Sequence, residues 1–362
     1  MSVSHTATAD PEPDTAINGG VDRVDPTGDA RWDADLAACP GATFFHGAAW
    51  AGVLKESYGF TPTYFAQRDS AGLRSLLPLM EVDSWLTGRR GVALPFTDEC
   101  PPLSAGPESF RRLHRAALDH AGTRRWKYLE FRGGRTLFGE VPASAAFLGH
   151  SLDLSRPEGE LFAGFDSSVR RAIRKAEQGG LTIQFSQDIE AVRAFHGLLL
   201  KTRKRHGVPP QPFHFFASIH RHVLARNKGW VVLARLGGVP VAGAMYFHFG
   251  HKVIYKYGAS DEAFQHLRAN NLVMWRAIAR YAGEGYTLLD FGRTAMENKG
   301  LRKFKLDWGS VERRVEYARF DRREGSFVVP GEALSGWQIR LFKVLPDWLF
   351  QWIGSALYRH AA

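Results

Sequence analysis

Cysteine is nearly absent from this sequence, since only Cys39 and Cys100 occur among its 362 residues. Two cysteines are too few for the disulfide framework of a small secreted domain, and they do not match the ligand pattern of a zinc site. We therefore expect both to be reduced thiols in a cytoplasmic protein, and we expect no bound metal.

Long apolar runs are missing as well. No uninterrupted apolar stretch reaches the roughly 20 residues needed to span a bilayer, and the N-terminus lacks the basic flank and apolar run of a signal peptide. These absences exclude a helical membrane-spanning protein. We expect a cytoplasmic location, with peripheral contact at the inner face of the membrane left open.

Positive charge, in contrast, is abundant. Lys and Arg number 47 against 37 Asp and Glu, which gives a formal net charge of +10. Such a surplus favours polyanionic partners, namely nucleic acid, anionic lipid headgroups or phosphorylated carriers, and it does not choose among them. A basic surface that only aids solubility is the alternative.

The order of predicted elements divides the chain into four parts. Residues 1–30 are polar, rich in Pro, Gly and Asp, and without periodicity, so we expect a disordered N-terminal arm. Residues 31–150 and 151–325 each contain helix, hairpin, strand, helix and strand in that order. This repetition predicts an α/β (α+β) fold of two duplicated domains, each with a mixed sheet flanked by helices.

The elements that support this prediction are recognised by apolar periodicity and by turn residues. In the first half they are a helix at 44–59, strands at 63–66, 76–80 and 92–96, a helix at 109–121 and a strand at 126–131. In the second half they are helices at 166–178 and 189–206, strands at 229–236, 240–249 and 252–260, a helix at 271–282 and a strand at 286–291.

The C-terminal part, residues 326–362, is dense in aromatic and aliphatic residues mixed with Arg and Lys, and Pro346 interrupts it. We expect two short amphipathic helices. They either pack on the second domain or form an interfacial membrane foot, because such feet combine aromatic and cationic residues.

The segment at 252–282 is a strand, a loop and a helix, which is where CoA-dependent GNAT enzymes hold a glycine-rich pyrophosphate loop. Here residues 265–271 read QHLRANN, without glycines at the expected spacing. A helix start remains, with Asn270 or Asn271 as the expected N-cap, so an anion can still bind there.

A second candidate site begins with the sequence Asp290-Phe291-Gly292-Arg293 at the expected end of a strand. Ligands bind at the carboxyl ends of strands in open α/β sheets. The planar guanidinium of Arg293 suits a phosphate or carboxylate, Asp290 suits proton removal from an amine or its orientation, and Lys305 suits stabilisation of an acyl oxyanion. The alternative is that Asp290 only ties the last strands together through Arg293 or Lys305.

Cations also cluster on the predicted helix at 166–178. Arg170 and Arg174 lie one helical turn apart, as do Arg171 and Lys175. The four side chains therefore cluster on adjoining faces of the helix. This surface either binds the phosphates of a carrier or of tRNA, in a salt-sensitive manner, or is simply solvated.

Seven short segments in order resemble the Fem-type aminoacyltransferases of the GNAT superfamily, most of all the FemAB-like branch associated with bacterial exopolysaccharide and PEP-CTERM protein-sorting loci. The resemblance runs from about residue 44 to residue 317 and is strongest after residue 168. The segments are VRRAIRKAEQGG (169–180), RKRHGVPPQP (203–212), PVAGAMYF (240–247), YKYGAS (255–260), NNLVMW (270–275), DFGR (290–293) and KFKLDWG (303–309).

The resemblance implies tandem GNAT-like domains with a substrate cleft between them and aminoacyl transfer without metal or CoA. The family's Phe-Lys motif falls on Phe304 and Lys305. The donor stays open between aminoacyl-tRNA and acyl-CoA, because no coiled-coil insert is present. The expected acceptor is the amine of a phosphorylated or lipid-linked envelope precursor.

In this interpretation Lys305 and Asp290 are the catalytic residues. The substrate-binding residues are expected to contact carrier phosphates or to line the cleft, and they are Arg293, Tyr257, Asn271, Phe304, Arg171, Arg174 and Lys175. A CoA-dependent N-acetyltransferase and a non-catalytic scaffold of a polysaccharide-synthesis complex are the rival functions.

Overall fold

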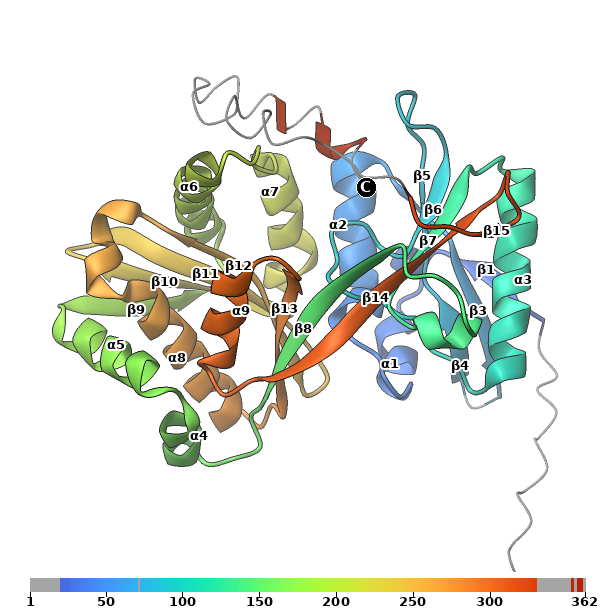
Figure 1. The fold of residues 1–362 in the computed structure, drawn as a ribbon. Coiled ribbons are helices and arrows are strands. Elements are labelled where there is room, and N and C mark those ends of the chain that lie inside the picture. Colours follow the sequence, from blue (N-terminus) through green and yellow to red (C-terminus); the bar gives the residue numbers. More distant parts are fainter. Residues whose placement is uncertain (1–19, 71, 331–352, 355–356, 361–362) are drawn as a thin grey trace, which may run out of the picture.

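The computed structural model describes residues 20–70, 72–330, 353–354 and 357–360, and it has two lobes side by side (Figure 1). We name residues 20–144 the first lobe and residues 155–310 the second lobe. Two long strands run between the lobes and join them. Among the described residues, no helix has both the length and the apolar character needed to cross a membrane.

The strands of the first lobe are β1 (Asp22–Val24), β2 (Thr61–Pro62), β3 (Tyr64–Asp69), β4 (Gly72–Leu77), β5 (Met80–Val82), β6 (Arg90–Val92) and β7 (Tyr128–Arg132). The joining strands are β8 (Ala145–Asp153) and β14 (Val311–Asp321), and β15 (Ser326–Phe327) follows β14. Those of the second lobe are β9 (Leu181–Ser186), β10 (Gly229–Leu236), β11 (Val239–Phe249), β12 (Lys252–Ser260) and β13 (Leu288–Ala295).

The α-helices are α1 (Trp32–Ala37), α2 (Ala48–Tyr58), α3 (Pro107–Thr123), α4 (Glu158–Gly164), α5 (Ser167–Gln178), α6 (Ile189–His206), α7 (Phe213–His222), α8 (Ala269–Gly283) and α9 (Lys299–Leu306). The short 3-10 helices are η1 (Pro26–Gly28), η2 (Phe44–His46), η3 (Arg135–Phe138), η4 (Leu224–Arg226) and η5 (Glu262–Leu267).

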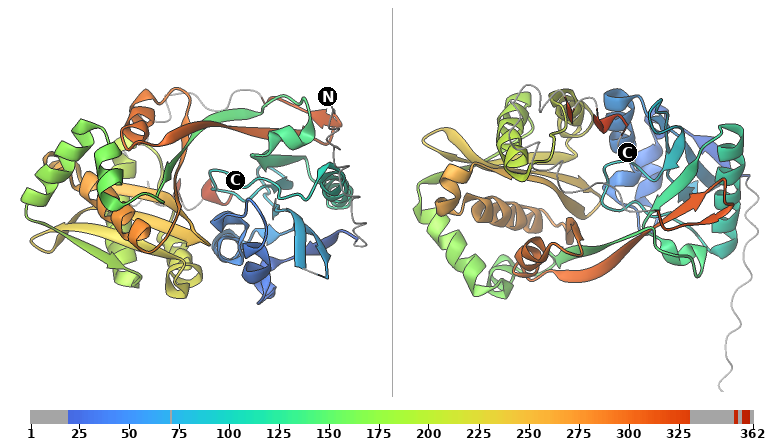
Figure 2. Two further views of the ribbon diagram at one scale, coloured as in Figure 1. Left: turned by 90° about the horizontal axis from the view of Figure 1, so that it is seen from below. Right: turned by 45° about the horizontal axis from the view of Figure 1, so that its top comes forward.

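One mixed sheet runs through both lobes in the order β2-β5-β6-β7-β14-β8-β13-β12-β11-β10-β9, and β1, β3 and β4 form a separate sheet. β14 pairs antiparallel with β7 of the first lobe and with β8, which in turn pairs with β13 of the second lobe. Figure 2 shows β8 and β14 bridging the two lobes. The mixed α/β architecture expected from the sequence is confirmed. The expectation of a separate mixed sheet in each domain is wrong, because β8 and β14 join strands of both lobes into one sheet.

Alternating side chains of the second-lobe sheet pack on two layers of helices. Val231 and Leu233 lie in a core with α6 and α7, whereas Val232 and Ala234 lie in a core with α5 and α8. This alternation is the period of two that a sheet covered on both faces requires.

The first of these cores continues into the first lobe. The ring of Trp50 on α2 lies 5.9 Å from that of Phe215 on α7, and the ring of Phe44 lies 4.9 Å from that of Phe247 on β11. Cys39 and Cys100 are both buried in this same core and are free thiols. The two lobes therefore share one apolar core.

The structure corrects four expectations about elements. The strand expected at 76–80 is divided, because β4 ends at Leu77 and β5 begins at Met80. Residues 22–28, expected in the disordered arm, form β1 and η1, because β1 pairs with β3 and Asp25 binds Lys55. The strand expected at 92–96 ends at Val92. The strand expected at 286–291 is β13, which continues to Ala295 through a bulge.

The expected C-terminal helices mostly lie outside the described residues. Ser326 and Phe327 form a strand that pairs with β14, and residues 331–352 are not described. Tyr358 and His360 are described, and they contact the first and second lobes: the Tyr358 hydroxyl donates to the Pro209 carbonyl (3.0 Å) and the Tyr358 ring packs on Phe96.

Candidate active site

The candidate site lies where β12 and β13 separate. The two parallel strands pair only from Lys252 with Leu288 to Ile254 with Asp290. Beyond this point β13 is bulged against β8, and Gly292 adopts a φ of +72°. A Cβ atom at Gly292 would lie 3.2 Å from the Asp98 carboxylate. Glycine at this position thus permits both the bulge and the close approach of the first lobe.

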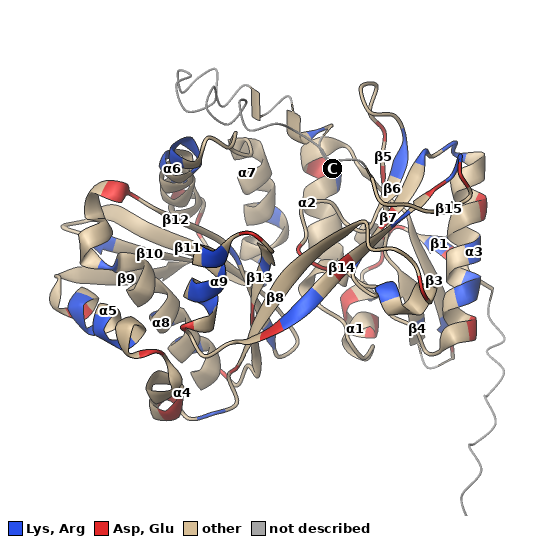
Figure 3. Cartoon of the chain, viewed as in Figure 1, with Lys and Arg blue, Asp and Glu red and all other residues tan. Residues whose placement is uncertain are grey.

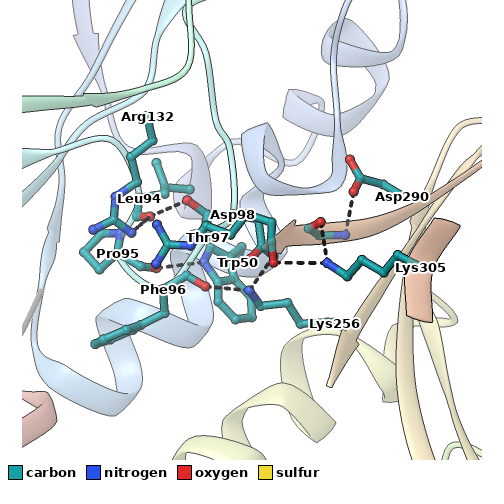
Figure 4. Close-up of polar contacts among 12 residues, drawn as sticks. Trp50, Leu94, Pro95, Phe96, Thr97, Asp98, Arg132, Lys256, Asp290 and Lys305 are labelled. Carbon is teal, nitrogen blue, oxygen red and sulfur yellow. Dashed lines mark hydrogen bonds and ion pairs between the residues drawn. The ribbon is translucent and has the colours of Figure 1, made fainter. Parts of the chain in front are cut away.

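A loop of the first lobe, residues 93–98, enters at this opening (Figure 4). Leu94 and Phe96 both have positive φ, +41° and +62°, which non-glycine residues rarely adopt. Strained backbone of this kind persists only where surrounding contacts enforce it. Here three side chains bind successive carbonyls: Arg132 at Leu94 (3.3 Å), Trp50 at Pro95 (3.3 Å) and Lys256 at Phe96 (2.7 Å).

Lys256 is a site residue that the sequence interpretation missed. It lies at a bulge of β12. Its neighbours Tyr255 and Tyr257 pair with Tyr246 and Met245 of β11, whereas Lys256 itself is paired with no residue of that strand. Its ammonium lies 3.0 Å from the Asp98 carboxylate, and its side chain is 6% exposed. The available signal was a lysine in an otherwise apolar strand of a sheet covered on both faces.

Burial and charge oppose each other in this ion pair. Burial lowers the pKa of Lys256, although Asp98 acts to raise it. Burial would raise the pKa of Asp98, but the charge and hydrogen bond of Lys256 hold that pKa below its ordinary value. Asp98 is therefore a carboxylate at neutral pH.

Lys305 lies on α9 and is fully enclosed, with 2% of its surface exposed. Its Nζ donates to the carbonyl oxygens of Gly292 (2.8 Å) and Arg293 (3.1 Å). Burial lowers the pKa of Lys305 to about 8, against the opposing effect of Asp98 and Asp290. In Figure 4 the Lys256 and Lys305 side chains both extend toward Asp98, with Asp290 beside Lys305.

The pKa of Asp290 is shifted in the opposite direction to that of Lys305. The Asp290 Oδ1 accepts a 2.6 Å hydrogen bond from the Gly292 amide, and its Oδ2 lies 3.5 Å from the Arg313 guanidinium. Burial raises the pKa of Asp290 to about 6, with smaller contributions from the charges of Asp98 and Glu99. A carboxyl group and an ammonium group thus both titrate near neutrality within one site, as general acid–base chemistry requires.

A cavity of about 250 Å³ opens beside Asp290, between the lobes. Carboxylates of Asp98, Glu99 and Asp290 line it together with the cations of Lys252 and Arg313. Arg313 also binds Glu99 (2.5 Å). The remaining lining residues are mostly apolar and are Gly41, Thr43, Phe44, Phe45, Pro101, Val253, Ile254 and Leu288. Because Asp98 is paired with Lys256 and Glu99 with Arg313, Asp290 is the lining carboxylate best placed to receive an ammonium group of a ligand.

Of the predicted binding residues, Arg293, Tyr257 and Phe304 lie near this site without lining the cavity. The Arg293 guanidinium donates to the Tyr317 hydroxyl (2.6 Å) and stacks 4.1 Å from the centre of the Phe147 ring. The Tyr257 ring packs on Phe216, and its buried hydroxyl has no hydrogen-bond partner among the described residues. Phe304 packs against Trp308.

The four other predicted binding residues lie elsewhere. Arg171, Arg174 and Lys175 are exposed on α5, which packs on α8 on the outer side of the second lobe (Figure 3). Asn271 lies in the first turn of α8, where Arg268 rather than Asn270 or Asn271 is the N-cap. Asn271 and Arg268 line a separate cavity of about 200 Å³.

The expected N-cap is wrong for a backbone reason. Arg268 ends η5 in the left-handed conformation, with φ of +58°. The helix α8 therefore begins at Ala269, before either Asn270 or Asn271. Asp261, at the start of η5, lines the same cavity and pairs with Lys201 (2.6 Å). An anion at this helix N-terminus would therefore face one carboxylate as well as the helix amides.

Comparison with known proteins supports the architecture. Residues 163–305, less than half of the chain, match the model of the acetyltransferase (GNAT) domain family. No curated protein sequence matches the chain significantly.

Solved structures extend the likeness to both lobes. FemX superposes with a TM-score of 0.66 at 15% identity, over 78% of this chain and 94% of FemX. A C-terminal DUF2156 domain assigned to a lysylphosphatidylglycerol synthetase of Agrobacterium fabrum gives 0.54 at 14%, over 76% and 89%. A tandem GNAT protein from the clavulanic acid biosynthesis pathway gives 0.50 at 12%, over 84% and 98%. At these identities the likeness shows a shared GNAT-like fold.

Proposed function

We propose that this protein is an acyltransferase that forms an amide on an acceptor amine in the cavity between its lobes. The observation that carries the proposal is the juxtaposition of Asp290 and Lys305, whose pKa values are shifted to about 6 and about 8. At neutral pH the first is mostly a carboxylate and the second mostly an ammonium, so one can accept a proton while the other stabilises negative charge.

The acceptor enters this scheme as an ammonium attracted by the carboxylates of the cavity. Asp290, which is 29% exposed, accepts a proton so that the amine lone pair becomes available. The amine attacks the acyl carbonyl carbon, a C–N bond forms, and the bond from that carbon to the leaving oxygen or sulfur breaks. The proton held by Asp290 passes to the leaving group, and the regenerated carboxylate takes the second proton from the attacking nitrogen and releases it to solvent.

Lys305 serves the oxyanion that forms during the attack. Two of its three N–H groups are directed to the carbonyls of Gly292 and Arg293. Lys305 is enclosed and does not line the cavity of the free protein, so the proposal requires that substrate binding bring the acyl oxygen to its third N–H. Fixed donors of this kind need no reorganisation when charge develops. Lys256 positions Asp98, which holds the Lys305 ammonium in its charged form.

We favour an aminoacyl donor and an envelope precursor as acceptor, in line with the Fem-type resemblance and its exopolysaccharide-associated branch. The structural likeness to FemX supports this choice. In this proposal Arg293 approaches a carrier phosphate when the Tyr317 contact opens, and the exposed cations of α5 bind the donor or carrier. In this proposal the reaction uses no cofactor, and the aminoacyl or acyl donor is consumed as a second substrate.

The experiment compares matched lysines on one helix. Turnover of the full chain is measured with aminoacyl-tRNA as donor and a UDP-linked precursor peptide bearing a free lysine amine as acceptor. We expect Lys305→Ala to lower turnover about 10²-fold or more, as loss of an oxyanion donor does. Lys303→Ala, an exposed residue of α9 paired with Asp307, should stay within about twofold of wild type. Wild-type turnover in Lys305→Ala would falsify the assignment.

A CoA-dependent N-acetyltransferase is the second candidate, and the cavity at the N-terminus of α8 favours it together with the GNAT-domain match. Calorimetric titration with acetyl-CoA distinguishes the two. Tight binding that Arg268→Ala weakens would select the CoA donor. Salt-sensitive binding of charged tRNA, without heat from acetyl-CoA, would select the aminoacyl donor.

A further inference from the structure

The hairpin of β5 and β6 exposes two large apolar side chains at its tip. Trp85 is 86% exposed, more than any other large apolar residue of the described part of the chain, and the adjacent Leu86 is 57% exposed. Figure 1 shows this hairpin extending beyond the rest of the first lobe. The pair belongs to neither the cavity between the lobes nor the α8 cavity.

The tip is held by hydrogen bonds, so its exposure is a feature of a defined turn. The Gly88 amide donates to the Ser84 carbonyl (2.7 Å), and the Thr87 amide donates to the Ser84 hydroxyl (3.0 Å). From outside the turn, Lys127 donates to the Thr87 carbonyl (2.9 Å). The turn therefore presents Trp85 and Leu86 in a fixed position.

His360 forms hydrogen bonds with two residues of the same hairpin. The Ser84 hydroxyl and the His360 ring nitrogen lie 2.8 Å apart, and Arg90 donates to the His360 carbonyl (2.8 Å). The His360 ring meets the edge of Trp85 at a centroid distance of 5.6 Å. Most of the Trp85 surface nevertheless remains in contact with water.

Cations lie beside this hairpin. Lys127, which donates to the Thr87 carbonyl, and Arg359, which precedes His360, are exposed, and Arg89 pairs with Asp83 (2.7 Å), the one acidic residue of the turn. A tryptophan and a leucine that project among Lys and Arg match the interfacial zone of a bilayer. There the indole lies at headgroup depth and the cations meet lipid phosphates.

A lipid surface fits this tip better than a protein partner does. A stable protein interface buries about 800 Å² on each side, whereas two adjacent side chains on a narrow turn supply only a small part of that area. We propose that Trp85 and Leu86, with the flanking cations, form a docking site for an anionic lipid surface. This site holds the protein at the membrane independently of the reaction between the lobes.

The test places an environment-sensitive fluorophore on Leu86→Cys of the full chain. Labelling is selective because the natural Cys39 and Cys100 are 7% and 0% exposed. With phosphatidylcholine vesicles that contain about one-third phosphatidylglycerol, we expect the emission to rise about threefold and to shift to the blue. Pure phosphatidylcholine vesicles should produce much less change, and added salt should reduce the response.

The matched control is Val239→Cys, a 56% exposed position at the start of β11 in the second lobe, where no change is expected. In parallel, Trp85→Ala/Leu86→Ala should lower co-sedimentation with anionic vesicles about tenfold at unchanged Tm. Unchanged co-sedimentation overturns the proposal. Two other results overturn it: a label shielded from aqueous quencher without lipid, which means that the chain covers the tip itself, or a changed oligomeric state, which means a second copy binds there.

Discussion

At the scale of single residues, the site depends on charged groups placed where water is scarce. Asp98, Lys256, Asp290 and Lys305 come from three strands or loops and one helix. The last three are each hydrogen-bonded to a backbone group, and the Asp98 carboxylate is paired with Lys256. Buried charges persist only when they are paired and hydrogen-bonded. The arrangement therefore holds each group in one orientation and shifts the pKa values of Asp290, Lys305 and Lys256 toward neutrality.

The raised pKa of Asp290 makes a prediction about stability that needs no substrate. The folded protein holds a proton on Asp290 up to pH of about 6, whereas the unfolded chain releases it near the ordinary value of 3.8. The free energy of unfolding contributed by this group therefore falls as pH rises from about 4 to about 6. Above that window the ionised carboxylate is a constant destabilising charge.

We expect Asp290→Asn to gain Tm relative to wild type as pH rises from 4 to 7.5, by about 2–4 °C in total. Differential scanning fluorimetry across this pH range measures the difference. Asp153→Asn on β8 is the control, because a backbone hydrogen bond from Ser155 lowers the pKa of Asp153 and the sign is reversed. A Tm difference for Asp290→Asn that is constant with pH would contradict the assigned pKa.

At the scale of elements, irregular backbone builds the site on regular strands. The bulges at Lys256 on β12 and at Gly292 on β13 direct side chains into the opening, and the loop at 93–98 fills it. The segment VALPF has strand-forming residues, but its carbonyls bind Arg132, Trp50 and Lys256 instead of a neighbouring strand. Tertiary contacts thus override local β-propensity.

Gly292→Ala tests the bulge of β13. An added Cβ would require a left-handed alanine and would press on the Asp98 carboxylate at 3.2 Å. We expect a loss of about 1–3 kcal/mol in the free energy of unfolding, measured with urea, and a loss of turnover. Gly283→Ala at the end of α8, where nothing lies within 4 Å, should be neutral or slightly stabilising. Equal stability of the two variants would rule out strain at Gly292.

At the scale of the whole molecule, the two lobes are physically coupled. β14 follows the second lobe in the chain yet completes the first, through its pairing with β7. The core that contains Trp50 and Phe215 also crosses the boundary. The domain boundary expected near residue 150 remains a prediction, and we expect neither lobe to keep its stability without the other.

Scanning calorimetry of the full chain should accordingly show one cooperative transition, with the van't Hoff and calorimetric enthalpies in agreement. The isolated fragment 1–154 lacks β14, which leaves an edge of β7 unpaired, so we expect it to aggregate or to show no sharp transition. Two well-separated transitions in the full chain, or a fragment 1–154 that melts cooperatively, would show that the lobes fold independently.

The sequence by itself determined many elements of each lobe and their order, but it predicted neither of the joining strands, β8 and β14. Apolar spacing of two or 3.6 residues reports which face of a strand or helix is buried, and this local property predicted α5, α6, β10, β11 and β12 closely. The sequence also made Asp290, at the expected end of a strand, and Lys305, in the Phe-Lys motif of the resemblance, candidate catalytic residues, and this assignment remains a prediction.

Only the tertiary structure decided how the two halves meet. The ion pair of Asp98 and Lys256 joins positions 158 residues apart in the sequence. The strand β14 follows the second lobe in the chain but pairs with β7 of the first lobe. Arg171, Arg174 and Lys175 show the converse, since local spacing groups them but the fold places them away from the cavity between the lobes. Strand pairing and charge burial of this kind bring together residues that are far apart in the sequence. Local periodicity reports only which face of an element is buried, so it cannot predict these long-range contacts.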